Sequence, residues 1–467
     1  MNSRERFAAI LVALARTAFC AYRAATQSLT GDEAFSYNNF ISGGWSRLYG
    51  HYDANNHVVY TILAKLSIRA FGVSEFTLRL PSVLAGFFFA LGIAWVLAAV
   101  SSSRVVRWTA IGALSLHPLF LDFSVAARGY GPSLALLIWA IYWFLRERDL
   151  AAGALLGLSM SANLTILYPA VGFVFCPYML RLGDTERRIQ SCLTMAFTAT
   201  GVFGGLCYPT LSKASASNFY VGTNHLAKAL QNLVITSLVG SERLGLFGVF
   251  DGMRLIQFVI VPLLAIFVLI VSTRTFLRAP ERRPALAPLA MLIAAAVELI
   301  AARHLVGMPY PVDRLGLYLV LLSGLAWAVA ATEAQGLLLL LPNAVLACAL
   351  LIQLITQIQT RYFQIWPYDL PAKDVARRLL EETKDKPPNS VMVSVTWWEQ
   401  PALEFYRGYY HIAALAPIQR FDVTPLEGFD YYVIHLKEDK SVPQAGLQRL
   451  HPLFHEPVSG VLLAREP

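Results

Sequence analysis

The sequence predicts a polytopic α-helical membrane protein of about eleven spans that ends in a small α/β domain outside the membrane. Of its 467 residues, 56% are hydrophobic and 15% are charged, proportions that are unusual for a soluble protein. The apolar residues come in blocks of about 20, the length that crosses hydrocarbon as a helix. Arginines gather in the short connections between these blocks, as cytoplasmic loops do. The net charge of +8 therefore reflects membrane topology, and no nucleic-acid partner is expected.

The first span is expected at about residues 7–27, after the basic residues Arg4 and Arg6. Arg16 and Arg23 interrupt this apolar run, and we expect both to face other helices or water rather than lipid. No clear small-x-small cleavage site follows the run. The segment is therefore interpreted as an uncleaved span with a cytoplasmic N-terminus.

The first outer loop runs from Thr30 to about Arg79 and contains a half-apolar stretch from His57 to Phe71. The polar breaks in this stretch predict a helix that lies along the membrane interface. The remaining spans are expected at about residues 80–100, 105–121, 130–146, 150–163, 165–181, 190–211, 254–273, 285–302, 315–332 and 337–358. Every inner connection except the last is arginine-rich, and this alternation predicts an outer C-terminus.

The composition changes after Pro367. We expect a transmembrane domain over residues 1–360 and a soluble α/β domain over 361–467 on the periplasmic face. Helical spacing marks 372–384 and 400–410, and buried-strand patterns mark 391–395 and 431–435. All five cysteines lie in apolar segments, so no disulfide framework is expected. This pattern favours a bacterial inner membrane over the endoplasmic reticulum.

Two adjacent carboxylates, Asp32 and Glu33, come just past the first span. A carboxylate near the membrane is costly to desolvate and usually faces a functional cavity. The alternative is a structural role in the first turn of a helix. Asp53 lies in the same outer loop and Asp122 lies in the next one. Acidic groups on one side of the membrane suit a pocket that deprotonates a hydroxyl or holds a metal ion.

Four sequence segments resemble those of a known family. They occupy residues 31–34, 71–82, 124–130 and 309–314. The first, Gly-Asp-Glu-Ala, resembles the acidic motif of the GT-C glycosyltransferases that use polyprenyl-phosphate sugars. That superfamily includes the protein O-mannosyltransferases and the lipid A aminoarabinose transferase. The other three phrases are similar to segments that these proteins carry in the same order, so the resemblance implies a fold of the GT-C type.

The resemblance implies an inverting glycosyltransferase that moves a hexosyl or pentosyl group from a polyprenyl-phosphate donor to a hydroxyl. Asp32 would act as the base on the acceptor or orient it. Glu33 and Asp122 would position the acceptor or stabilise charge. The acceptor, a glycan, lipid or protein, would meet the donor at the outer face, among membrane lipids.

Cationic groups at the outer ends of spans would hold the leaving phosphate, because guanidinium groups bind phosphate oxygens bidentately. The alternative for each of them is snorkelling at the interface. Arg128 and Arg314 are preferred because both lie in family-like phrases. The expected substrate-binding residues are Asp53, Asn56, His57, Tyr60, Arg128, Tyr130, Arg303, His304 and Arg314.

Some relatives bind a divalent metal at such carboxylates and a nearby histidine, whereas others need none. His51 and His57 are the candidate ligands here. The chain departs from the family at two places. Asn55-Asn56-His57 stands where many relatives have Lys-Pro-Pro, and Ala126 stands where others have Glu. These departures leave the sugar and the acceptor open.

Two other functions stay open at this stage. One is a transporter or a flippase for lipid-linked sugars, although paired helix breaks with polar residues at mid-depth are not evident. The other is a non-catalytic scaffold, which would leave the outer acids unexplained. In the soluble domain, Trp397 and Trp398 would form either a sugar-stacking edge or a packed core pair.

Overall fold

The computed structural model describes residues 1–215, 218, 221–239, 256–334, 357–420, 426–437, 442 and 444–466. The chain forms two compact units, each described here by itself. Unit 1 comprises residues 1–21, 49–60 and 81–358, and unit 2 comprises residues 22–48, 61–80 and 359–467. Unit 2 thus takes in parts of the first outer loop besides the C-terminal hundred residues. The division expected from the sequence, at residue 360, stays a prediction.

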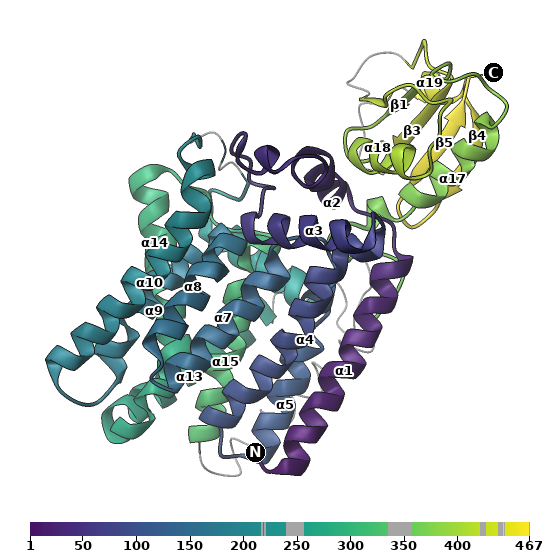
Figure 1. Cartoon of the computed structure of the whole chain (residues 1–467). Coiled ribbons are helices and arrows are strands. Elements are labelled where there is room, and N and C mark those ends of the chain that lie inside the picture. Colours follow the sequence, from purple (N-terminus) through teal and green to yellow (C-terminus); the bar gives the residue numbers. More distant parts are fainter. Residues whose placement is uncertain are drawn as a thin grey trace. The chain divides into compact units, whose positions relative to one another are not determined.

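Unit 1 is a helical bundle (Figure 1). Its helices are α1 (Ser3–Thr26), α4 (Glu75–Val100), α5 (Arg104–Ser115), α6 (Pro118–Asp122), α7 (Tyr130–Leu145), α8 (Asp149–Ala162), α9 (Leu167–Leu180), α10 (Thr185–Leu211), α11 (Leu226–Val234), α13 (Val261–Arg278), α14 (Ala287–Val306) and α15 (Leu317–Glu333). The unit boundary falls within α1 and α4. Helix α8 packs against α7 and α10, and α14 packs against α9 and α15.

Six helical segments of the described residues are long and apolar enough to cross a membrane. They are Ser3–Thr26, Glu75–Val100, Thr185–Leu211, Phe258–Arg278, Pro280–Val306 and Asp313–Glu333. Three shorter apolar helical segments span Tyr130–Leu145, Asp149–Ala162 and Leu164–Leu180. Each of the nine overlaps a span expected from the sequence, and the chain is an integral membrane protein. The span expected at 337–358 lies almost wholly outside the described residues, so the count of eleven stays a prediction.

The span expected at 105–121 differs from the structure, because helix α5 ends at Ser115 and α6 begins at Pro118. Proline cannot donate a backbone hydrogen bond and disfavours helical geometry in the preceding residue. The chain therefore breaks at Leu116 and His117. This break leaves the Ser115 and Phe120 carbonyls within reach of Arg16, whose guanidinium donates to both.

Arg16 confirms the expectation that the arginines of the first span avoid lipid. It is buried and also donates to the Gly86 carbonyl and to Ser124 Oγ, at 2.8 Å and 2.6 Å. A charge in an apolar span is tolerated when such partners replace water. Arg23 is likewise buried, and it donates to the Tyr362 carbonyl within unit 2.

Unit 2 contains a five-stranded sheet with helices beside it (Figure 1). The strands are β1 (Val393–Val395), β2 (Gln419–Arg420), β3 (Tyr431–His435), β4 (His451–Glu456) and β5 (Val461–Arg465), and the helices named with them are α17 (Ala372–Thr383), α18 (Gln400–Tyr409) and α19 (Gln444–Leu447). The strand order is β2-β1-β3-β5-β4. Strand β1 pairs parallel with β2 and β3, whereas β5 pairs antiparallel with β3 and β4. The predicted C-terminal α/β arrangement is confirmed, including both predicted helices and both predicted strands.

Two helices of the segment from Thr30 to Arg79 belong largely to unit 2. Helix α3 (Val58–Phe71) confirms the helix predicted from His57 to Phe71, while its placement at a membrane interface stays a prediction. Helix α2 (Gly31–Ser36) contains the two adjacent carboxylates and packs against α18. Tyr37 and Phe405 place their rings 5.0 Å apart at this contact. The acidic residues are therefore held by the same compact unit as the C-terminal sheet.

Candidate functional site

The first cluster is the acidic anchor, which we define as Thr30, Glu33 and Arg79 in unit 2. Thr30 Oγ1 accepts a hydrogen bond from the Glu33 amide, and Glu33 Oε2 accepts one from the Thr30 amide, at 3.2 Å and 2.8 Å. This reciprocal capping box starts α2. Glu33 is fully buried, and Arg79 Nε and Nη2 donate to its two oxygens at 2.8 Å and 2.7 Å. The anchor therefore combines a helix cap with a bidentate buried ion pair.

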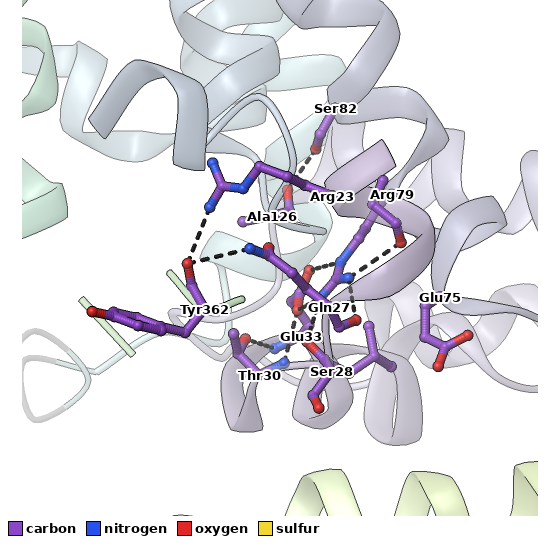
Figure 2. Close-up of polar contacts among 12 residues, drawn as sticks. Arg23, Gln27, Ser28, Thr30, Glu33, Glu75, Arg79, Ser82, Ala126 and Tyr362 are labelled. Atoms are coloured by element: carbon purple, nitrogen blue, oxygen red, sulfur yellow. Dashed lines mark hydrogen bonds and ion pairs between the residues drawn. The ribbon is translucent and has the colours of Figure 1, made fainter. Parts of the chain in front are cut away.

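Arg79 also holds the end of helix α1. Its Nη1 and Nη2 groups donate to backbone carbonyls of Gln27 and Ser28 at 2.8 Å and 2.6 Å, and Figure 2 shows these contacts beside the Glu33 pair. The ring of Phe363 lies 5.2 Å from the same guanidinium. Because several partners surround it, the Arg79 charge is satisfied although the side chain is completely buried. This geometry makes Glu33 a structural residue that fixes its neighbour Asp32.

Asp32 lies in the first turn of α2 and is only partly buried. Its backbone carbonyl accepts a hydrogen bond from Ser36 Oγ. Gly31 precedes it, and a Cβ at Gly31 would lie 2.6 Å from the Trp398 carbonyl oxygen. Only glycine tolerates that approach. The structure thus presents Asp32 at a fixed helix start, close to the polypeptide that follows β1.

A buried carboxyl group, Asp369, belongs to the same surroundings and was not predicted from the sequence. It is 2% exposed, and neither carboxyl oxygen has a hydrogen-bond partner at full bonding geometry among the described residues. Burial, and then the charge of Glu399, raise the pKa of Asp369 well above its usual range, and Asp32 and Glu33 add to the rise. The Gly31 amide lowers the pKa without reversing that rise. Asp369 therefore tends to keep its proton.

The second cluster is the basic cluster, defined as His57, Arg128 and Arg314 in unit 1. His57 is buried, and its Nδ1 lies 3.0 Å from the Ala162 carbonyl oxygen. Its Nε2 is buried and has no hydrogen-bond partner among the described residues. Burial, and then the charge of Arg128, lower the pKa of His57 well below its usual range, and Arg314 adds to this effect. The structure therefore brings together the two arginines that the sequence favoured, around a neutral imidazole.

Arg128 is 2% exposed and donates from Nη2 to Asn55 Oδ1 at 2.7 Å. The position after it is closely packed, because a Cβ on Gly129 would lie 1.9 Å from the Ala162 carbonyl oxygen. Ser82 Oγ donates to the Ala126 carbonyl at 2.7 Å, as Figure 2 also shows. These contacts fix the backbone of residues 126–129 and hold the guanidinium in one place.

The other residues expected in the substrate pocket fall in unit 1 as well. Tyr130 places its ring 5.1 Å from that of His57, and Tyr60 is buried. Asp53 accepts hydrogen bonds from the Asn55 and Asn56 amides, which makes a tight turn before α3. Asp122 is buried at the end of α6. The structure gathers His57, Tyr130, Arg128 and Arg314, whereas Asp32 and Glu33 lie in unit 2.

Three of the expected residues lie in more exposed surroundings. Arg303 donates from Nη1 to the Gly307 carbonyl at the end of α14, and His304 is exposed beside it. His51 is also exposed. Among the described residues, no group of three or more His, Cys, Asp or Glu side chains comes together to hold a metal ion. Metal binding by His51 and His57 therefore stays a prediction.

Sequence reasoning missed Arg79, Asn55 and Asp369. Arg79 carried a usable signal, since a charged residue just before Pro81 at the start of a long apolar helix needs a buried partner. Asn55 could have been found only from its place in a turn next to Asp53. Asp369 carried no local signal, because its significance arises from Gly31 and Glu399, which are distant in the sequence.

Comparisons with known proteins give matches to solved structures. ArnT from Cupriavidus metallidurans, in a structure bound to undecaprenyl phosphate, is 14% identical with a TM-score of 0.55, over 98% of this chain and 97% of that one. The oligosaccharyltransferase of Archaeoglobus fulgidus, tethered to an acceptor peptide, is 12% identical with a TM-score of 0.51, over 100% of this chain and 74% of that one.

No protein-family model and no curated protein matches the sequence. The two solved structures are GT-C glycosyltransferases. At such low identity they establish the architecture, and the expectation from the four sequence phrases is confirmed at that level: this chain has the GT-C fold.

Proposed function

We propose that this protein is a membrane glycosyltransferase that moves a sugar from a polyprenyl-phosphate donor to a hydroxyl acceptor on the outer face of the membrane. The GT-C fold supports the reaction class, and the undecaprenyl phosphate named with ArnT supports the donor class. The observation that carries the proposal is the acidic anchor. In it, the buried carboxylate of Glu33 pairs with Arg79 and holds the start of the helix that carries Asp32.

The proposed reaction is a direct displacement. The acceptor oxygen attacks the anomeric carbon, and the bond from that carbon to the phosphate oxygen breaks. The electron pair leaves with the lipid phosphate, and the configuration at the anomeric carbon inverts. Asp32 takes the acceptor proton as the new bond forms, so it needs to act as a base only late in the reaction.

The basic cluster would hold the lipid phosphate. Arg128 and Arg314 bring positive charge to the surroundings of His57, and guanidinium groups match phosphate oxygens bidentately. His57 donates from Nδ1 to the Ala162 carbonyl, so in the neutral ring Nε2 is left as a hydrogen-bond acceptor. Phosphate binding would also relieve the repulsion between the two arginines.

The remaining assignments are part of the same proposal. Glu33 acts through Asp32 and is a positioning residue. Asp122, Asp53, Asn56, Tyr60 and Tyr130 would shape the pocket, and Arg303 and His304 would lie at its margin. We place the protein in a bacterial inner membrane with its N-terminus cytoplasmic and its C-terminal domain periplasmic, because the arginine-rich connections favour that orientation.

The test is sugar transfer by the full chain in proteoliposomes. Radiolabelled polyprenyl-phosphate sugars would be offered with a cell-envelope extract, and the wild type compared with Asp32→Asn. We expect transfer to fall about 100- to 10,000-fold, the usual effect of removing a general base, while donor binding is retained. Asp374→Asn is the matched control, since Asp374 is an exposed carboxylate of the same unit.

Equal transfer by Asp32→Asn and the wild type would remove Asp32 from the mechanism and direct attention to Asp53 and Asp122. Movement of lipid-linked sugar across the bilayer without any transfer would replace the proposal by a flippase. Unchanged transfer in the presence of a chelator would agree with a mechanism in which these residues act without a metal.

A further inference from the structure

The aromatic pair Trp397 and Trp398 follows strand β1 in unit 2 and lies beside the acidic segment. The Trp398 carbonyl oxygen would be 2.6 Å from a Cβ on Gly31, so the two backbones are in direct contact. Gly31 immediately precedes Asp32. The pair therefore contacts the residue that precedes Asp32, which we propose as the acceptor-side base.

The two indole rings form a platform. Their centroids are 3.7 Å apart with an interplanar angle of 30°, so one face of Trp397 is covered by Trp398. Trp398 is supported from another side by Tyr368, at 5.1 Å, and Tyr368 in turn contacts His435. Trp397 nevertheless remains 49% exposed. A stacked but half-exposed ring is unusual for a tryptophan that serves only to fill a core.

The surroundings of the platform are acidic. Glu399 directly follows the pair and is buried, with Oε2 accepting a hydrogen bond from Thr396 Oγ1. The buried Asp369 carboxyl lies next to Gly31 and is influenced by Glu399. An exposed aromatic ring matches the C–H side of a pyranose, whose C–H groups are weakly positive.

We propose that Trp397 and Trp398 form a subsite for a sugar ring of the acceptor, which makes the acceptor a glycan or a glycolipid. The inference rests on the proposed function insofar as it assigns the ring to the acceptor rather than to the donor. The assignment follows from the contact with Gly31, because the acceptor hydroxyl must reach Asp32. The donor phosphate is assigned to the basic cluster.

A lipid-facing anchor is the main competing role, since tryptophan is common at membrane interfaces. The sugar panel distinguishes the two roles, because a lipid anchor would give no pyranoside signal that depends on Trp397. A core pair is disfavoured by the exposure of Trp397. The carbohydrate assignment accounts for a half-exposed, stacked indole ring beside the segment that carries Asp32.

The experiment uses the full chain in phospholipid nanodiscs, free of sugar-headed detergent. Saturation-transfer NMR would be recorded with a panel of methyl hexosides, methyl hexosaminides and their disaccharides. We expect signals from one face of at least one pyranose with the wild type and with Trp397→Phe, which keeps an aromatic face. With Trp397→Ala the signal should fall at least about fivefold.

Trp45→Ala is the matched control, because Trp45 is an exposed tryptophan of unit 2 whose ring is faced by Lys65 and Arg69. It should leave the sugar signals unchanged. Thermal midpoints of all variants would show whether Trp397→Ala still folds. Equal signals with Trp397→Ala and the wild type, or no signal from any pyranoside with the wild type, would overturn the inference.

The transfer assay separates this inference from the proposed function. Once an acceptor is found, Trp397→Ala should raise its KM about five- to tenfold with little change in kcat or in the donor KM. A raised donor KM instead would overturn the acceptor assignment, as would an active acceptor without a sugar. If the wild type transfers no sugar but its pyranoside signals depend on Trp397, the subsite stands and the proposed function fails.

Discussion

The acidic surroundings of Asp32 and the basic cluster around His57 both bring like charges close together, and in each of them the pKa of one neighbouring group is shifted. In unit 2, Asp369 lies near three carboxylates, and burial together with their charges raises its pKa well above the usual range. In unit 1, His57 lies near two guanidinium groups, and its lowered pKa keeps it neutral. In each cluster, burial and like charges shift the pKa of one group against its charged form. The difference is that Glu33 has a dedicated counter-ion, Arg79, which holds the chain in place.

This comparison shows that one loop of the sequence contributes residues to both units. Residues 30–48 and 61–80 belong to unit 2, whereas residues 49–60 belong to unit 1. The acidic anchor is built for stability, because its charges satisfy one another. The basic cluster gathers positive charge around a neutral histidine and is suited to an anion. Substitutions in the two regions should therefore fail in different measurements.

The largest effect is expected from Arg79→Leu. It leaves the Glu33 carboxylate buried without its counter-ion, which typically costs about 3–5 kcal/mol of unfolding free energy. We expect a lower thermal midpoint and early proteolysis near α2. Arg47→Leu is the control, because the hydrogen bonds that Arg47 of the same unit makes to Asn38 and Ser42 are exposed.

A double variant tests whether the unpaired Glu33 charge causes the loss of stability. Glu33→Gln combined with Arg79→Leu should recover part of the lost stability, since a neutral amide replaces the buried charge. A single Arg79→Leu variant as stable as the wild type would show that the anchor does not hold the acidic segment.

Arg128→Ala should mainly weaken the binding of the lipid phosphate rather than lower the folding stability. Removing one partner of a buried charged contact costs about 2 kcal/mol or more, which is about 30-fold in affinity. Binding of undecaprenyl phosphate to the full chain in nanodiscs would measure it. Arg128→Lys should fall between the two, because lysine keeps the charge without the bidentate geometry.

Arg188→Ala is the matched control for that measurement, since Arg188 donates to a backbone carbonyl from an exposed position. Unchanged phosphate binding by Arg128→Ala would remove the basic cluster from the donor site, whatever its effect on the thermal midpoint.

Gly31→Ala tests the contact between the acidic segment and the residues after β1. The added Cβ would lie 2.6 Å from a backbone oxygen, and overpacking of this kind costs about 1–3 kcal/mol. Both the thermal midpoint and transfer should fall, because Asp32 must shift with its neighbour. Gly44→Ala is the control, as the nearest atom to its added Cβ is a serine hydroxyl at 3.6 Å. Equal behaviour of the two variants would contradict the close contact.

Asp369→Asn should give the smallest change, and its sign depends on pH. A carboxyl group whose folded-state pKa is raised contributes stability below its unfolded pKa of about 4, and that contribution is lost as the pH rises through the folded-state value. Asparagine avoids this loss. The variant should therefore be more stable than the wild type at pH 8 by about 1 kcal/mol, with the difference vanishing towards pH 4.

Thermal midpoints from pH 4 to 8 would measure the effect. The effect of His57 on stability has the opposite pH dependence. Because its pKa is lowered in the folded state, stability is lost as the pH falls through its unfolded-state value. A His57→Gln variant should thus lessen acid sensitivity. A pH-independent difference between Asp369→Asn and the wild type would contradict the assigned protonation.

The sequence predicted most of the described helices and two strands of the C-terminal sheet, because hydropathy, arginine placement and alternation depend on neighbouring residues. It also singled out Glu33 of the acidic anchor and the three residues of the basic cluster as candidates. It did not divide the first outer loop between two units. That division depends on contacts such as Leu29 with Tyr406 Oη and Ser28 Oγ with the Leu370 carbonyl, which join residues more than 300 positions apart. The pairing of Glu33 with Arg79 and the protonation of Asp369 are likewise products of tertiary packing.

The buried Arg16 has a consequence for the order in which the protein is assembled. Its guanidinium is satisfied by Gly86, Ser115, Phe120 and Ser124, none of which has been synthesised when the first helix enters the bilayer. A lone arginine in a span costs about 2.5–3.5 kcal/mol on insertion scales. The first helix should therefore rest at the translocon or the membrane surface until the segment ending near residue 124 arrives. Arg16 makes the membrane insertion of the N-terminal helices a cooperative event.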